Sequence, residues 1–278
     1  MSSVATGAGR LVVCPTPIGN LEDVTLRVLS ALRDADVVAC EDTRRTRVLL
    51  DRYGVKARLV SYHEHNERAR AAELVEKMRA GAVVALVSDA GMPLVSDPGY
   101  LLVRACVAAG LPVEVLPGPS AAITALVASG LPADEWHFHG FLPRKKGELR
   151  EVLSGGDGTL VAFESPRRLP ATLALLSELD PEREVAVCRE LTKAHEEIVR
   201  GSAAELAARY ADAPPKGEIV LVIAPPAAAK ASDAPDPKAL EALRQLVDAG
   251  AHPRKAASVV ASLTGTSANA LYRALTSK

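Results

Sequence analysis

The chain has 278 residues, of which 48% are hydrophobic, and a formal net charge of −1. That apolar content supports a full core, so global disorder is excluded, and the length suffices for two ordinary domains and an appendage. No apolar run approaches the roughly 18 residues of a membrane span, and the start lacks the apolar segment of a signal peptide. We therefore expect a cytoplasmic protein without a membrane segment, in which any basic surface is a local patch.

Residues 1–10 are expected to form a disordered tail, after which a short apolar strand, a turn and a helix recur about five times. The predicted strands are 11–14, 37–40, 59–61, 83–87 and 113–116, and the predicted helices are 24–33, 67–79, 100–109 and 121–129. Alternating strands and helices indicate a mostly parallel sheet with helices on both faces. We therefore predict an N-terminal α/β domain over 11–131.

The stretch 83–100, VVALVSDAGMPLVSDPGY, carries the strongest signal for a ligand site. Its apolar start predicts a buried strand, and Asp97 and Pro98 suit the cap and the first position of the next helix. A second loop, Pro117 to Ser120, repeats the pattern, with Ser120 expected to cap the helix after it. Loops at the carboxyl ends of strands bind ligands in open α/β sheets, so two such loops predict a cradle for a small polar ligand. The chain has neither a G-x-G-x-x-G fingerprint nor a P-loop, so nothing in it supports binding of nicotinamide or ATP.

Four charged residues, Glu41, Asp42, Arg44 and Arg45, follow the predicted strand at 37–40. Two interpretations stay open for them. They form either a functional cluster at the end of the strand, or the capped start of a helix whose charges pair with one another.

Neither the histidines nor the cysteines form a metal motif. His63 and His65 lie two residues apart, whereas the helical zinc motif places its histidines four apart, so we predict no metal site. Polar lining of a cleft, or a general base from one histidine, remains open. The cysteines form no C-x-x-C pair and are expected to be reduced, buried thiols: Cys14, Cys40, Cys106 and Cys188.

The composition changes after Gly130, where the segment 136–141 holds the only Trp and two of the three Phe. We predict a second, α+β domain with a mixed sheet over 132–224. Its expected strands are 136–141, 159–163, 184–188, 197–200 and 219–223, and Ser202 with Glu205 forms a capping box. A basic loop, Arg144 to Lys146, precedes a helix. Positive charge there opposes the helix dipole, which favours an anion-binding role over a merely solvated helix start.

A Pro/Ala-rich linker is predicted over 225–236, followed by an appendage of three helices over 237–278 that is shaped like a helix-turn-helix. Two roles stay open for this appendage. It is either a packing or dimer element, or a nucleic-acid reader with a modest supply of basic residues, which are Arg254, Lys255, Arg273 and Lys278.

Nine segments occur in a fixed order along the chain: TPIGNLEDVTLR, EDTRRT, YHEHNE, LVSDAGMPLVSDPGY, LPGPSA, GFLPRKKGE, ESPRR, RELTKAHEE and KGEIVLV. Together they resemble the ribosomal RNA small subunit methyltransferase I family of the tetrapyrrole methylase superfamily, over about 11–223. The resemblance implies an α/β, two-domain tetrapyrrole-methylase-like (class III methyltransferase) fold with S-adenosylmethionine in a cleft. It also implies a homodimer that methylates the 2′-hydroxyl of a cytidine in the decoding region of 16S rRNA, within the small ribosomal subunit.

The resemblance and the strand-end argument together give three sets of candidate residues. The candidates for cofactor binding are Pro17, Gly19, Asp89, Ala90, Gly91, Met92, Pro93, Ser120, Ala121, Glu164 and Glu218. A ribose hydroxyl is a poor nucleophile, so a nearby base or polarising cation is expected, with unranked candidates Glu41, Asp42, Arg44, His63 and Lys193. The candidates for holding RNA phosphates are Arg144, Lys145, Lys146 and Arg167.

Three positions depart from the pattern that is usual in this family. Met92 stands where Thr is common, and Arg45 and Arg167 stand where His is common. The change at Arg167 shifts that position toward phosphate binding and away from proton transfer. Two alternatives remain: a corrin or precorrin methyltransferase of the same fold, and a non-catalytic RNA-binding protein of ribosome assembly. The basic loop and the appendage argue against the corrin alternative.

Overall fold

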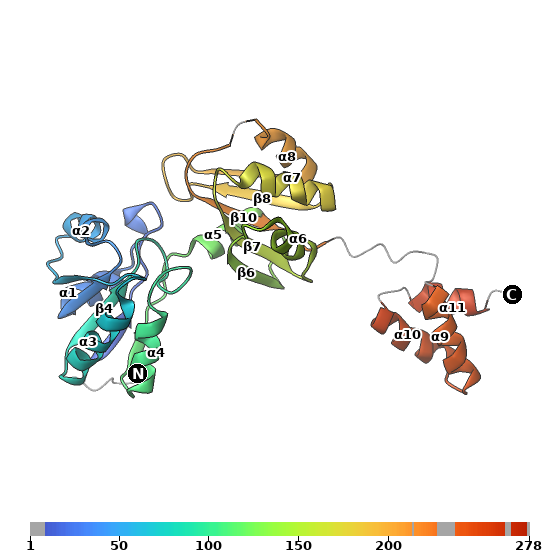
Figure 1. Cartoon of the computed structure of the whole chain (residues 1–278), viewed down its shortest axis with the longest axis horizontal. Coiled ribbons are helices and arrows are strands. Elements are labelled where there is room, and N and C mark those ends of the chain that lie inside the picture. Colours follow the sequence, from blue (N-terminus) through green and yellow to red (C-terminus); the bar gives the residue numbers. More distant parts are fainter. Residues whose placement is uncertain (1–8, 213, 227–236, 265–267, 277–278) are drawn as a thin grey trace. The chain divides into compact units, whose positions relative to one another are not determined.

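A computed structural model describes residues 9–212, 214–226, 237–264 and 268–276, and the chain divides after Ala224 into two compact units (Figure 1). The tail predicted over 1–10 lies outside the described residues up to residue 8, and Arg10 already belongs to the first strand, so the predicted end of the tail is wrong. Residues 227–236 of the predicted linker and residues 265–267 of the predicted appendage also lie outside the described residues.

The first sheet has five strands that are all parallel, in the order β3-β2-β4-β1-β5. Its strands are β1 (Arg10–Val13), β2 (Val37–Cys40), β3 (Leu59–Ser61), β4 (Val83–Val87) and β5 (Val113–Val115). The order reverses around β4 and β1, which lie side by side although the chain visits two strands between them. In open parallel sheets such a reversal places the ligand site at the carboxyl ends of these strands.

Helices cover both faces of this sheet, as predicted. They are α1 (Leu26–Asp34), α2 (Thr43–Arg52), α3 (Glu67–Arg79) and α4 (Tyr100–Ala108), with a short 3-10 turn, η1 (Leu21–Asp23), before α1. Side chains alternate along each strand, so one face packs on α3 and α4 and the other on α1 and α2. The start predicted for α1 at residue 24 is two residues early, because Thr25 caps the helix by accepting from the Val28 N–H.

The second sheet is mixed, in the order β6-β7-β10-β8-β9, with only β6 and β7 parallel. Its strands are β6 (Trp136–Phe141), β7 (Thr159–Glu164), β8 (Glu184–Arg189), β9 (Glu197–Ser202) and β10 (Ile219–Ile223). Three helices pack on one face: α6 (Lys146–Ser154), α7 (Leu169–Leu179) and α8 (Ala203–Tyr210). The capping box predicted for Ser202 and Glu205 at the start of α8 is confirmed.

The other face of the second sheet is covered by α5 (Ala121–Ser129), which Figure 1 shows in green beside β10. Ala122, Ala125 and Leu126 of this helix share a buried cluster with Val161 and Val220 of the sheet. The helix therefore follows the first sheet in the chain but packs on the second, so the segment before it must cross from one sheet to the other.

The smaller unit holds α9 (Pro237–Asp248), α10 (Pro253–Thr264) and α11 (Ala268–Thr276) around a core that includes Leu243 and Leu271. The three helices match the predicted appendage, and both roles considered for it stay open. No helix of the described residues is long and apolar enough to cross a membrane. All four cysteines are free and buried, as predicted.

Candidate active site

The larger unit contains a cavity of about 450 Å³ at the carboxyl ends of the central strands of the first sheet. Its lining comes from the loops after β2 and β4, from the start of α5, and from β7, β10 and β6 of the second sheet. A volume of this size falls in the range of small-molecule sites. The cavity therefore lies where both the reversal of strand order and the predicted ligand-binding loops place a site.

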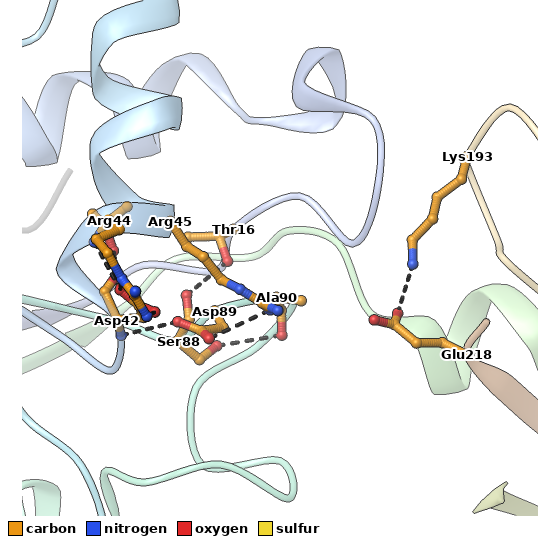
Figure 2. Close-up of polar contacts among 10 residues, drawn as sticks. Thr16, Asp42, Arg44, Arg45, Ser88, Asp89, Ala90, Lys193 and Glu218 are labelled. Carbon is orange, nitrogen blue, oxygen red and sulfur yellow. Dashed lines mark hydrogen bonds and ion pairs between the residues drawn. The ribbon is translucent and has the colours of Figure 1, made fainter. Parts of the chain in front are cut away.

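The first turn and the central loop are joined at the base of this cavity. Thr16 and Gly91 exchange two main-chain hydrogen bonds, each with an N···O distance of 2.9 Å. The Thr16 hydroxyl also donates to the Ser88 carbonyl at 3.1 Å (Figure 2). Gly91 has a φ of 77°, which a side chain would strain, and this conformation turns the chain after β4 along the cavity.

Asp89 links the ends of the two strands β2 and β4. Its Oδ1 accepts from the Asp42 N–H at 3.0 Å, and its Oδ2 lies 3.4 Å from Nη1 of Arg45. Figure 2 shows Arg45 reaching from α2 over the Asp89 carboxylate. Glu41 lines the cavity next to this pair. Its pKa is raised by burial and by the nearby Asp89 charge.

Asp97 does not cap α4 as predicted; Gly99 occupies the cap position with a φ of 138° and α4 begins at Tyr100. The Asp97 carboxyl instead lines the cavity. Burial raises its pKa to about 6, and the charges of Glu41 and Asp89 add to the rise, although a hydrogen bond with Ser88 opposes it. Three carboxyl groups thus gather at one wall of the cavity.

The loop that carries Asp97 has an unusually strained backbone. Leu94 and Ser96 have φ values of 73° and 65°, in the left-handed region that L-residues rarely adopt. The φ of 138° at Gly99 would strain an L side chain, and a Cβ there would also lie 2.7 Å from a methyl of Leu94, so this position favours glycine. Such strain, of order 1–3 kcal/mol per residue, is typical of functional segments.

Asp42 and Arg44 pair with each other instead of lining the cavity. The Arg44 Nη2 atom lies 2.6 Å from Asp42 Oδ2, and the Asp42 side chain caps α2 by accepting from the Arg44 N–H. These hydrogen bonds lower the pKa of Asp42. The capped-helix interpretation therefore holds for Asp42 and Arg44, while Glu41 and Arg45 lie at the cavity.

Lys193 forms ion pairs with two glutamates, Glu190 and Glu218. Its Nζ lies 2.9 Å from Glu190 Oε1. It also lies 3.0 Å from Glu218 Oε2, a contact that Figure 2 shows. Burial alone would lower the pKa of Lys193, but these two hydrogen bonds outweigh it and the pKa is raised. Glu218 lines the cavity and Lys193 does not, so Lys193 contributes to the site by orienting the Glu218 carboxylate.

Gly19 lies against the Lys193 loop. A Cβ at Gly19 would meet Lys193 Cγ at 2.5 Å and Thr192 Oγ1 at 2.7 Å, and the Asn20 N–H donates to the same hydroxyl at 3.0 Å. Gly19, a candidate for cofactor binding, thus lies against a loop of the second half and is not part of the cavity lining. Pro17 and Pro93 lie outside the cavity lining.

The Glu164 carboxylate is buried and contacts other groups of the protein. Its Oε1 accepts from the Ser165 N–H, and its Oε2 accepts from the Thr172 hydroxyl, both at 2.6 Å. Oε2 also lies 3.4 Å from Nη2 of Arg168, whose guanidinium donates to the carbonyls of Leu142 and Pro143. Glu164 thus fixes the chain that enters the basic loop.

Aromatic lining was not foreseen. Phe141 and Phe163 both line the cavity, and the ring of Phe163 contacts Phe138 and Phe141 at centroid distances of 5.0 and 5.4 Å. Strict alternation along β6 would put Phe138 and Phe141 on opposite faces. A bulge between Phe138 and Gly140 shifts the register, so both rings reach Phe163.

The remaining candidates lie away from the cavity lining. His63 Nε2 lies 3.2 Å from the Asn66 amide, and its Nδ1 is buried with no hydrogen-bond partner in the described part of the chain. The cations Arg144, Lys145, Lys146 and Arg167 are exposed, and Lys145 pairs with Glu148 at 2.8 Å. Within the described residues, no group of three or more His, Cys, Asp or Glu side chains could hold a metal ion.

Of the predicted site residues, nine line this cavity: Glu41, Asp89, Ala90, Gly91, Met92, Ser120, Ala121, Glu164 and Glu218. Ser120 occupies the cap position of α5, but its side chain makes no capping hydrogen bond there. The side chain and the first N–H groups of the helix are therefore available to a ligand.

Residues 10–207 match the family model of tetrapyrrole (corrin/porphyrin) methylases. A ribosomal RNA small subunit methyltransferase I of Mesorhizobium japonicum is 49% identical over 95% of this chain and 90% of its own length. The chain belongs to the tetrapyrrole methylase family, in the branch named ribosomal RNA small subunit methyltransferase I. The fold and the methyltransferase class expected from the sequence are thereby confirmed.

Two solved structures of a tetrapyrrole methyltransferase are similar in fold to this methyltransferase. Uroporphyrin-III-C-methyltransferase from Thermus thermophilus is 26% identical, with a TM-score of 0.54 over 77% of this chain and 94% of that chain. A second structure of the Thermus enzyme, complexed with S-adenyl homocysteine, is 23% identical, with a TM-score of 0.55 over 77% and 97% of the two chains. That second likeness concerns the fold alone.

Proposed function

We propose that this methyltransferase transfers the methyl group of S-adenosylmethionine to the ribose 2′-hydroxyl of a cytidine in the decoding region of 16S rRNA. The observation that carries the proposal is the distribution of charge around the cavity. Acidic side chains at the strand ends of the first sheet line it, and the segments that line it from the second sheet continue into exposed arginines and lysines. A cation and a polyanion are the two substrates that such a site suits.

The chemistry of the cavity fits the donor. S-adenosylmethionine combines a cationic sulfonium, an amino-acid group and an adenine, and it supplies a methyl group bonded to positively charged sulfur. Glu41, Asp89 and Asp97 offer negative charge, the start of α5 offers free N–H groups for a carboxylate, and Phe163 offers an apolar surface. The spare Ser120 hydroxyl adds a polar contact.

The chain's own groups would help the reaction mainly by positioning. Holding the ribose oxygen in line with the methyl carbon can supply roughly 7–11 kcal/mol of the barrier. The hydroxyl must also lose its proton, and Glu41 is the one predicted catalytic candidate that lines the cavity. Lys193 would act by orienting Glu218, and Asp42 and Arg44 by fixing the start of α2.

The family also contains enzymes that methylate tetrapyrroles, and a corrin ring is the main alternative substrate. The cations Arg144, Lys146 and Arg167 are exposed. They favour RNA as the substrate, because RNA presents a row of phosphates to them and a tetrapyrrole has no such backbone. A homodimer and a cytoplasmic location complete the proposal, in keeping with the work of an rRNA-modifying enzyme.

Transfer of a tritium-labelled methyl group to small ribosomal subunits, purified from a strain that lacks this gene, tests the proposal. Label on the ribose of one cytidine is the expected result. Label on a base, or no transfer by a protein that still binds the donor, would refute it. Asp89→Ala is the control for background, since it removes a carboxylate from the cavity wall; we expect it to lose donor affinity and keep a folded core.

A further inference from the structure

Phe141 is the most exposed aromatic side chain that lines the cavity. The residue is 64% exposed, although a ring of this size is normally buried. Phe163 holds the ring by an edge contact at a centroid distance of 5.4 Å. An apolar ring that is fixed on one side and open to solvent at a cavity mouth is a surface on which another flat group can stack.

The backbone around this ring is held rigidly. Leu142, the next residue, is buried, and its N–H donates to the Phe163 carbonyl at 3.1 Å. The Arg168 guanidinium donates to the carbonyls of Leu142 and Pro143 and is itself anchored by the buried carboxylate of Glu164. The ring is therefore presented by a preorganised chain, so a stacking partner would not have to order a loop.

Positive charge lies directly beyond the ring in the chain. Arg144 and Lys146 are exposed and have no ion-pair partner among the described residues, whereas Lys145 pairs with Glu148. Arg167, two residues after the cavity-lining Ser165, is exposed and likewise has no ion-pair partner in the described part of the chain. An aromatic platform flanked by unpaired cations is the arrangement that binds single-stranded nucleic acid.

We propose that Phe141 stacks on the base of the nucleotide whose ribose is methylated, while Arg144 and Lys146 hold the neighbouring phosphates. This inference rests on the proposed function. Proteins read single-stranded RNA by splaying bases out and stacking them on aromatic side chains. A base on Phe141 would hold its own ribose at the cavity mouth, so the platform selects an unpaired nucleotide and positions the sugar.

A cycle that combines a protein variant with an RNA variant tests the stacking directly. The RNA is a decoding-region oligonucleotide, either intact or abasic at the target nucleotide, and its affinity is measured for wild type and Phe141→Ala. On intact RNA we expect Phe141→Ala to bind roughly 5- to 150-fold more weakly, the range for losing one base–aromatic stack. On abasic RNA wild type and variant should bind equally, and Phe141→Trp should retain affinity for intact RNA.

Two controls separate stacking from other effects. Val107→Ala shortens the side chain of a residue on α4 that is 67% exposed, and it should leave RNA affinity unchanged. Phe141→Leu keeps an apolar side chain for the fold but offers no flat face, so it should lose intact-RNA affinity as Phe141→Ala does.

Three outcomes would overturn the inference. One is an equal loss of affinity on intact and abasic RNA. Another is weaker donor binding by Phe141→Ala in calorimetry without RNA, which would assign the ring to the donor. The third is a change of sedimentation in Phe141→Ala, which would make the ring a contact between two copies of this chain. Failure of the wild type to label any ribose would instead refute the proposed function itself.

Discussion

Replacement of Glu164 by glutamine tests whether a buried carboxylate holds the rim of the cavity. The Glu164 carboxylate is enclosed and receives three groups: the Ser165 N–H, the Thr172 hydroxyl and the Arg168 guanidinium. All three are donors, and a carboxylate accepts from all of them. A glutamine amide has one oxygen and brings two N–H donors of its own, so at least one donor must lose its acceptor.

The expected cost follows from these contacts. Breaking a buried ion pair typically costs about 3–5 kcal/mol, because the remaining charge is left without a partner. Arg168 keeps its two carbonyl acceptors and is 29% exposed, which lowers the penalty. We therefore expect Glu164→Gln to lose about 2–3 kcal/mol of unfolding free energy.

Denaturant unfolding of Glu164→Gln beside Glu178→Gln measures this loss. Glu178 also pairs with an arginine at 3.4 Å, but both partners are about half exposed, so its replacement should cost less than about 1 kcal/mol. Equal losses in the two variants would refute the assigned role. Calorimetry with S-adenosylmethionine gives a second readout. If Glu164 instead contacted the methyl donor directly, Glu164→Gln would weaken binding of S-adenosylmethionine without lowering stability.

Three further outcomes are expected. Asp97→Asn should raise the free energy of unfolding by about 1 kcal/mol at pH 8 and leave it unchanged near pH 4. The pKa of Asp97 is about 6 in the folded chain and 3.8 in the unfolded chain, so the wild type loses stability as pH rises through this window, and asparagine does not ionise. Thermal melts at both pH values check this. Gly19→Ala should weaken donor binding more than it lowers the melting temperature, since its methyl displaces the Lys193 loop. Replacing Arg144 and Lys146 by Glu should make the slope of log affinity against log salt concentration shallower by about 1 for each lost phosphate contact. An unchanged slope would show that this loop does not contact RNA phosphates.

Strand and helix positions could be predicted where apolar runs are short and end in turn residues. The bounds predicted for β2, β4, β10 and α3 match the structure. Helix caps were predicted less well. The side chains of Asp42 and Ser202 cap their helices, whereas those of Ser120 and Asp97 do not, because a cap depends on the direction in which the chain enters the helix. Residue type alone does not carry that direction.

The site could be predicted only as far as strand ends define it. Asp89 to Met92 and Ser120 were found because they follow strands that meet at one edge of the sheet. Phe141 was missed because a bulge, with Gly140 at a φ of 76°, changes which face of β6 it occupies. The rarity of aromatic residues was the available signal, since a chain with only three Phe that exposes one of them at a cavity is unusual.

The proposed function assigns different charged groups to the two substrates. Glu41, Asp89 and Asp97 line the side of the first sheet, while Arg144 and Lys146 follow the segment that lines it from the second. Under the proposed function, the carboxylates of the lining favour the cationic methyl donor, and the exposed cations outside the lining favour the polyanionic RNA. Methyl transfer removes the positive charge from sulfur, so we infer that the acidic wall holds the spent donor less tightly than a fresh one. Under the proposed function, the same carboxylates would therefore favour both binding of the methyl donor and release of the product.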